Sequence, residues 1–205
     1  MRRPRRLLPR LAAVAISGVV AALAIPTLVP PLLRRRLTRV EVAGGSMTPA
    51  LLPGDFLVVR RGAPHLDRAY GQIVATTDPR PEGESRLLLK RVVGLPGESL
   101  RVGGGVLVNG RRLVEDYAHG DDPIAQHRGV QRLAEDTCFL LGDNRAASTD
   151  SRDFGPVHRT RIEGVAIARY WPPSRVGWLR PPARHFEDAP AEPPQATGAP
   201  HPHEH

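Results

Sequence analysis

Short runs of aliphatic and β-branched residues, separated by glycine and proline, occupy most of the chain after residue 36. Runs of this length and composition are typical of β-strands, because branched side chains pack well on a pleated surface. No helical pattern of about 10–15 residues alternates with them, which argues against a parallel sheet built from βαβ units. We therefore predict a mainly β, antiparallel domain. Its expected strands are Val40–Ala43, Phe56–Arg60, Gln72–Thr76, Arg86–Val93, Leu100–Val102, Val106–Val108, Cys138–Leu141 and Val165–Trp171.

Residues 11–33 differ from the rest of the chain because all 23 of them are uncharged. As a helix this segment would be roughly 34 Å long, enough to cross a bilayer core of about 30 Å. We therefore expect a single-pass transmembrane anchor, preceded by a basic segment at residues 1–10. The alternative is a removed signal peptide, because Ala22-Leu23-Ala24 is typical of a small-residue cleavage site and Pro26 interrupts the second half.

The net charge of +8 is concentrated near the amino terminus. Eight arginines lie within residues 2–36, and Glu41 is the first acidic residue. From residue 37 onward 21 basic residues meet 21 acidic ones, so the remaining chain lacks the basic stripe that phosphate binding requires. Nucleic acid is therefore excluded as a partner. Arginines on both sides of residues 11–33 favour a cytoplasmic amino end only mildly.

The 205 residues are enough for one domain with appendages. We place that domain at residues 37–180, with the polar residues 112–136 as a surface insertion between two core strands. From Pro181 the last 25 residues contain seven prolines and four histidines, which predicts a disordered tail at 181–205. Because a flexible tail is a poor preformed metal site, no metal or cofactor is expected.

Lys90 is the only lysine in a chain with 28 arginines, and it follows the apolar run Leu87–Leu89. Arginine stays protonated at cellular pH, whereas desolvation can lower the pKa of a lysine amine by several units. The run and nearby apolar strands would supply that desolvation, so Lys90 is a candidate general base. The alternative is a coding bias that replaced the surface lysines by arginine.

Ser46 lies in Gly44-Gly45-Ser46-Met47-Thr48-Pro49, where a strand ends and the chain must turn. Such a turn exposes the serine hydroxyl and leaves backbone N–H groups free beside it, as an oxyanion hole requires. The alternative is an ordinary Gly-Ser turn. The single cysteine, Cys138, lies in an apolar run and is expected to be a core residue rather than a nucleophile.

Three segments in order, at residues 42–51, 90–98 and 142–157, together closely resemble type I signal peptidases. The third contains Gly142-Asp143-Asn144-Arg145, followed by Ser148-Thr149-Asp150-Ser151-Arg152. The resemblance covers roughly residues 5–175. It implies an antiparallel β catalytic domain on the extracytoplasmic side of the cell membrane, behind an N-terminal transmembrane helix. Exported preproteins with signal peptides would be its substrates, and the lipid bilayer and the secretion translocon would be partners.

The resemblance also assigns roles to individual residues. Ser46 corresponds to the nucleophile, and Lys90 to the base that takes its proton. Ser148 corresponds to a hydroxyl that hydrogen-bonds Lys90 and aims it. Shallow apolar subsites for small P1 and P3 side chains, of the Ala-x-Ala type, would be lined by Val40, Val42 and Leu89. Supporting roles fall to Gly44, Gly45, Met47, Arg91, Asp143, Asp150 and Arg152, with Asp150–Arg152 and Asp143–Arg91 as ion pairs.

Gly44 departs from family members that place a serine two residues before the nucleophile, which leaves the Ser46 amide as the expected oxyanion donor. Trp171 and Trp178 are expected either in the lipid headgroup layer or in ordinary packing.

The sequence disfavours three other functions. A Ser/Lys autoprotease of the repressor class would need an amino-terminal DNA-binding module, and a hydrophobic segment stands there instead. A Ser-His-Asp hydrolase is disfavoured because no Gly-x-Ser-x-Gly sequence surrounds Ser46. An inactive membrane-anchored binding homologue would have lost Ser46 or Lys90, and both are present. A processing protease dedicated to one substrate stays open.

Overall fold

The computed structural model describes residues 36–80, 86–120 and 130–187. Its contacts divide the chain into two units, residues 1–38 and 39–205, and only residues 36–38 of the first are described. The predicted basic segment and anchor lie outside the described residues. Within the described ranges, no helix combines the length and the apolar character needed to cross a bilayer.

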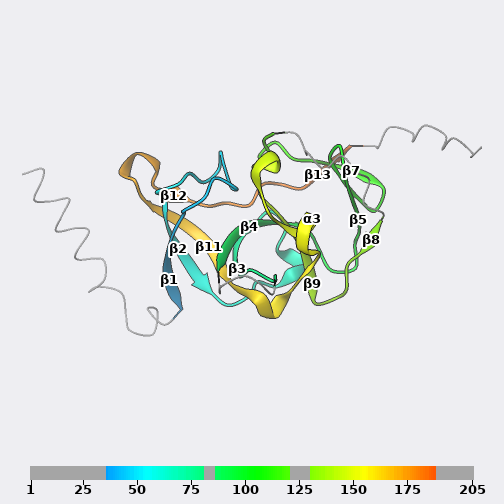
Figure 1. The fold of residues 1–205 in the computed structure, drawn as a ribbon, viewed down its shortest axis with the longest axis horizontal. Helices are drawn as coiled ribbons and strands as arrows, with labels where there is room; N and C mark the ends of the chain where they lie inside the picture. Colours follow the sequence, from blue (N-terminus) through cyan, green and yellow to red (C-terminus); the bar gives the residue numbers. More distant parts are fainter. Residues whose placement is uncertain (1–35, 81–85, 121–129, 188–205) are drawn as a thin grey trace, which may run out of the picture. The chain divides into compact units, whose positions relative to one another are not determined.

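The described strands form two antiparallel sheets (Figure 1). The aliphatic runs of the sequence predict most strands of the first sheet. Its strand order is β1-β2-β11-β3-β4-β9-β10, and β12 pairs with β11. The strands are β1 (Leu37–Glu41), β2 (Phe56–Arg61), β3 (Ile73–Thr77), β4 (Leu87–Gly94), β9 (Thr137–Leu141), β10 (Val157–His158), β11 (Ile162–Trp171) and β12 (Gly177–Trp178).

The second sheet has the order β13-β7-β6-β5-β8. It consists of β5 (Ser99–Val102), β6 (Val106–Val108), β7 (Arg111–Val114), β8 (Gln131–Arg132) and β13 (His185–Glu187). The helical elements described are short: η1 (Leu66–Arg68), η2 (Arg145–Ala147), α3 (Ser151–Phe154), η3 (Arg159–Arg161) and η4 (Pro173–Arg175).

β11 is the central connection of the first sheet. It pairs with β2 along one edge and with β3 along the other, although β2 and β3 are consecutive strands in the chain. β2 lies especially close to β11 at Gly164, where a Cβ atom would overlap the Arg60 carbonyl oxygen and the Val59 side chain. In the backbone pairing of the described strands, the β1-β2 pair is therefore joined to the β3-β4 pair, and hence to Lys90, through β11.

The apolar side chains form separate clusters that join the sheets and support the loop after β1. One cluster contains Val93 and Leu141 of the first sheet together with Leu100 and Val106 of the second. Another contains Met47, Leu51 and their neighbours on β2 and β3. The first cluster fixes the second sheet against β4 and β9, and the other holds the loop that carries Ser46.

All eight predicted strands are present, with ends shifted by up to about three residues. The predicted surface insertion at 112–136 is wrong at both ends. β7 and β8 lie there, and Leu113 and Leu133 are buried in the core. These strands escaped prediction because polar and charged residues surround the single buried leucine in β7, Leu113, and the one that follows β8, Leu133. Residues 121–129 lie outside the described part.

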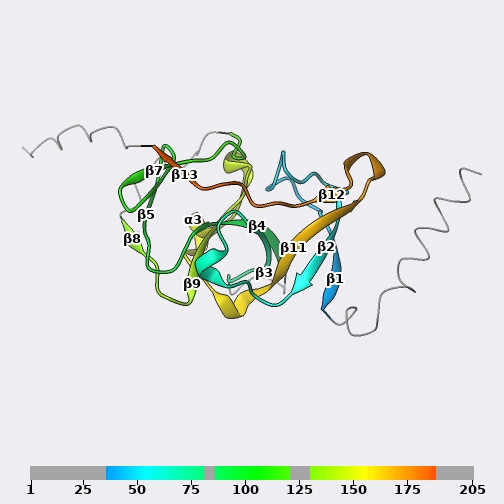
Figure 2. The same cartoon turned by 180° about the vertical axis from the view of Figure 1, so that it is seen from behind.

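The predicted start of a disordered tail at Pro181 is also wrong. Figure 2 shows the chain running on from β12 to β13, which pairs with β7. Phe186 packs against the core, and Arg184 donates hydrogen bonds of 2.6 and 2.8 Å to the Glu98 carboxylate. These two contacts order residues 181–187 despite their composition. The rest of the predicted tail lies outside the described residues.

Candidate functional site

Ser46 and Lys90 meet although 44 residues separate them in the sequence. Ser46 lies in the loop after β1, and Lys90 lies on β4 opposite Val74 of β3. Lys90 Nζ donates a hydrogen bond of 2.7 Å to Ser46 Oγ. The lysine is 3% exposed. The structure therefore brings together the two residues that the sequence paired.

The buried position changes the acid–base behaviour of Lys90. Burial is the main cause that lowers its pKa, to about 8, while the nearby Asp150 carboxylate raises it and Arg152 lowers it. Of the predicted run, Leu87 is exposed and the next two leucines are half-buried. The neighbouring strand β3 places the fully buried Val74 opposite Lys90. Near neutral pH a far larger fraction of an amine with this pKa is unprotonated, and so able to accept a proton, than of an ordinary lysine.

The Ser46 loop is held by the third motif. Asn144 donates its N–H to the Ser46 carbonyl oxygen at 3.0 Å and its side-chain amide to the Gly45 carbonyl oxygen at 3.3 Å. Gly142 lies so close that a Cβ atom there would overlap the Ser46 carbonyl oxygen and Ser148 Oγ. The Ser46 N–H itself donates to no group in the described part of the chain. It is free to bind a developing oxyanion.

Both ion pairs predicted from the family pattern are present and buried. Arg91 binds Asp143 with two hydrogen bonds of 2.7 and 2.5 Å and also donates to the Gly71 carbonyl oxygen. Arg152 Nε and Nη2 donate to the two Asp150 oxygens at 2.9 and 3.0 Å. The second pair extends to the Gly142 N–H, which donates to Asp150 Oδ2.

These two carboxylates respond differently to their surroundings. Burial raises the pKa of Asp143 even though Arg91 opposes it. At Asp150 burial also raises the pKa, but hydrogen bonds from Arg152 and the Gly142 N–H outweigh it, so the pKa is lowered. Neither carboxylate is hydrogen-bonded to Lys90 in the described structure. Both therefore support the loop rather than share the lysine proton.

Ser148 does not make the predicted hydrogen bond to Lys90. Its Oγ is buried beside Gly142 and close enough to Asp150 to help lower that pKa, but no hydrogen-bond partner is in bonding geometry among the described residues. The reason is local: η2 ends at Ala147, and Ser148 follows in an extended conformation at the contact with Gly142. Among the described residues, Ser46 is the one hydrogen-bond partner of the Lys90 side chain.

A cleft of about 310 Å³ opens beside the pair. It includes the three predicted subsite residues Val40, Val42 and Leu89. β9 pairs with β4 only from Arg91 onward, so Leu87–Lys90 present an open backbone edge among the described strands. Lining residues that the sequence analysis missed are Glu41, Ala43, Arg80, Arg86, Leu87, Leu88, Ala147 and Thr149. Adjacency to Leu89 or Ser148 was the available signal for three of them, Leu88, Ala147 and Thr149.

Neither Cys138, the alternative nucleophile, nor any described histidine, the alternative base, lies in this cleft. Cys138 is fully buried, and burial raises the pKa of its thiol to about 12. The described residues also contain no group of three potential metal ligands. The chemistry available in the cleft is therefore that of a serine hydroxyl and a lysine amine.

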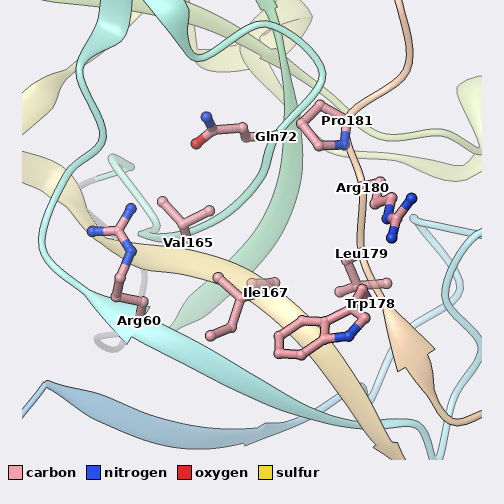
Figure 3. A pocket seen from close by; sticks show the side chains of 9 residues that line it. Arg60, Gln72, Val165, Ile167, Trp178, Leu179, Arg180 and Pro181 are labelled. Carbon is pink, nitrogen blue, oxygen red and sulfur yellow. The ribbon is translucent and has the colours of Figure 1, made fainter. Parts of the chain in front are cut away.

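A separate groove of about 530 Å³ lies between β11 and the chain around β12 (Figure 3). Val165 and Ile167 form its floor, with Arg60 on one side and Trp178 and Arg180 on the other. It shares no lining residue with the cleft. The side chain of Trp178 is 72% exposed, which excludes core packing for this tryptophan.

Comparisons with known proteins agree with the motif pattern. A family model described as "Signal peptidase, peptidase S26" matches residues 12–171. Signal peptidase I of Leptolyngbya laminosa is 38% identical over 144 residues, covering 67% of this chain and 70% of that protein. Mitochondrial ATP-independent inner membrane protease subunit 1a of Arabidopsis thaliana is 34% identical over 151 residues, covering 70% and 76%. A crystal structure of a signal peptidase I from Enterococcus faecalis V583 is 31% identical, covering 47% of this chain and 93% of that chain, with a TM-score of 0.39.

Proposed function

Because this chain belongs to the signal peptidase family, peptidase S26, we propose that it cleaves signal peptides from exported preproteins by a Ser46/Lys90 dyad. Family membership makes it a serine peptidase, a hydrolase that acts on signal peptides. The main support for the dyad is the 2.7 Å hydrogen bond between Lys90 Nζ and Ser46 Oγ. Burial lowers the pKa of this amine to about 8.

In the proposed reaction the neutral Lys90 amine takes the Ser46 proton while Oγ attacks the scissile carbonyl carbon. The tetrahedral intermediate collapses as the Lys90 ammonium gives that proton to the leaving amine, and an acyl-enzyme remains on Ser46. Lys90, neutral again, then takes a proton from water as the water oxygen attacks the ester. Collapse of the second intermediate returns the proton to Ser46 and releases the signal peptide as a carboxylic acid.

The unpaired Ser46 N–H is the proposed donor to the oxyanion in both intermediates. Loss of one such donor typically lowers kcat by about 10²–10³-fold. The Ser46 N–H can act as this donor because it makes no hydrogen bond within the described part of the chain. Gly44 has no side chain to add a second donor. Its hydrogen could be replaced without steric conflict, since no atom lies within 4 Å of a Cβ built there.

An extended substrate segment would pair with the open edge of β4 at Leu87–Lys90, next to β1. Main-chain hydrogen bonds to such an edge bind a peptide without regard to its sequence. Selectivity would then come from Val40, Val42 and Leu89. The apolar surface of these three residues would accept alanine and disfavour a charged side chain, which would lose its hydration there.

Peptide cleavage by the purified full-length chain tests this proposal. A signal-peptide analogue with alanine at P1 and P3 is expected to be cut after P1, and phenylalanine at P1 is expected to lower kcat/KM by at least about 10-fold. Mass spectrometry of the products locates the cut. The Ser46→Ala variant is the control for a contaminating protease. Equal cleavage of both peptides, or cleavage by the control, would contradict the proposal.

We further propose that residues 11–33 anchor the chain in the cell membrane with residues 37–187 on the extracytoplasmic side. The support is the uncharged length of the segment and the location of signal-peptide cleavage sites beside the membrane. External protease should digest the domain in spheroplasts; protection there, with digestion only after lysis, would reverse the orientation.

A further inference from the structure

The residues after β7, 115–119, extend from the second sheet to the loop that carries the third motif. Glu115 accepts two hydrogen bonds from the Arg145 guanidinium, at 2.7 and 2.9 Å. Both side chains are 8% exposed. The Tyr117 hydroxyl donates to the same carboxylate at 2.8 Å. Burial raises the pKa of Tyr117, so its hydroxyl keeps the proton that it donates.

Backbone bonds fix the same loop from the same segment. His119 donates its N–H to the Asp143 carbonyl oxygen at 2.7 Å and accepts one from the Arg145 N–H at 2.8 Å. Arg145 Nε donates to the Gly142 carbonyl oxygen at 3.1 Å. Residues 142–145 are thus tied to residues 115–119 on one side. On the other side Asn144 donates its N–H to the Ser46 carbonyl oxygen.

The strand of Lys90 is contacted by the same residues. The Tyr117 ring lies against the Arg91 guanidinium, 4.4 Å from the guanidinium carbon to the ring centroid. Arg91 is adjacent to Lys90 on β4 and is the partner of Asp143. Residues 115–119 therefore contact both the loop behind Ser46 and the residue next to Lys90.

We propose that Glu115 and Tyr117 are positioning residues that hold Ser46 Oγ and Lys90 Nζ within proton-transfer distance. The inference rests on the proposed dyad and adds two residues that lie outside the three motifs. Neither lines the cleft, so neither touches substrate. Proton transfer requires a separation of about 2.6–3.2 Å, and a misplacement of about 1 Å costs roughly 10²-fold in rate. Loss of their contacts should therefore lower kcat and leave KM unchanged.

Glu115→Gln in the full-length chain is the first test. The amide keeps the shape of the carboxylate but cannot neutralise Arg145 or accept two charged hydrogen bonds as strongly. We expect kcat for the alanine peptide to fall by about 10- to 100-fold while KM stays within about 2-fold of wild type. Glu98→Gln is the matched control, because Glu98 also binds an arginine, Arg184, through two hydrogen bonds. It is expected to lower thermal stability comparably and to leave kcat within about 2-fold.

Two substitutions at Tyr117 provide a second test that does not depend on whether the Glu115→Gln variant folds. Tyr117→Leu removes the ring beside Arg91 and should lower kcat by about 10-fold or more, whereas Tyr117→Phe keeps the ring and should lose less. Wild-type kcat in Glu115→Gln or in Tyr117→Leu, a rise in KM alone, or parallel losses in Glu98→Gln would overturn the positioning role. Failure of the dyad itself is distinguishable, because wild type would then cleave no faster than Ser46→Ala.

Discussion

Replacing Lys90 by arginine is expected to lower kcat/KM for signal-peptide cleavage by about 10³-fold or more. The guanidinium keeps the positive charge but stays protonated at any pH at which the protein is folded, so it cannot take the Ser46 proton. No second amine can replace it, since Lys90 is the only lysine of the chain. Peptide turnover by the purified variant measures the loss, and a rate above about a tenth of wild type would contradict the dyad.

Two further variants separate chemistry from folding. Lys90→Met keeps a long apolar stem in the buried position and removes the titrating amine, so it should fold like wild type and be equally inactive. Arg132→Lys exchanges the same two residue types at an exposed position on β8 and should retain full activity. Circular dichroism and thermal unfolding of all three establish that they are folded.

The same amine predicts the pH dependence of the wild-type enzyme. The base must be neutral to act, and burial lowers the pKa of Lys90 to about 8. Activity should therefore rise with pH, reach half its maximum near this pKa of about 8, and fall about tenfold per unit below it. The pH profile of kcat/KM reports this pKa. A single limb centred near about 6.5 would indicate a histidine base instead.

Asp143→Asn is expected to lower the free energy of unfolding by about 3–5 kcal/mol. Arg91 and Asp143 are both buried, and the amide would leave the guanidinium without a counter-charge and turn an N–H₂ group toward it. Removing one partner of a buried pair costs more than the pair contributes, because the other charge stays desolvated. Urea unfolding of wild type and variant measures the difference.

An exposed ion pair provides the contrast. Asp136 and Arg159 are 3.9 Å apart, with side chains 61% and 52% exposed. Asp136→Asn removes the same kind of charge and should cost less than about 1 kcal/mol. A similar loss at both positions would show that burial is not what makes the Arg91–Asp143 pair important.

The dyad and its two buried ion pairs could be predicted from the sequence because their residues lie in the three segments that resemble type I signal peptidases. Lys90 also stood out on composition alone. The sequence did not show how far the run Leu87–Leu89 is itself buried, and these leucines line the open cleft. Which neighbours desolvate a strand residue is decided by strand order, and here β3 supplies Val74. A local run of apolar residues does not carry that information.

Glu115 and Tyr117 illustrate what a single sequence conceals. They stand in a polar stretch that resembles a surface excursion, and nothing nearby indicates a partner 30 positions away at Arg145. Phe186 was hidden in the same way by the prolines and histidines around it. In both cases one buried side chain among polar neighbours determines the local structure, and the average composition of the segment does not reveal that residue.

The position of β11 has a consequence for the time at which the sheet can be completed. β2 and β3 are made early, but the strand that joins them begins about a hundred residues later, at Ile162. Pairing over such separations is slow and must wait for the later strand to emerge from the ribosome. A nascent chain that ends before β11 carries both Ser46 and Lys90 but lacks the sheet that brings them together. The described sheet that positions Ser46 and Lys90 is therefore expected to be complete only after nearly all of its strands have been synthesised.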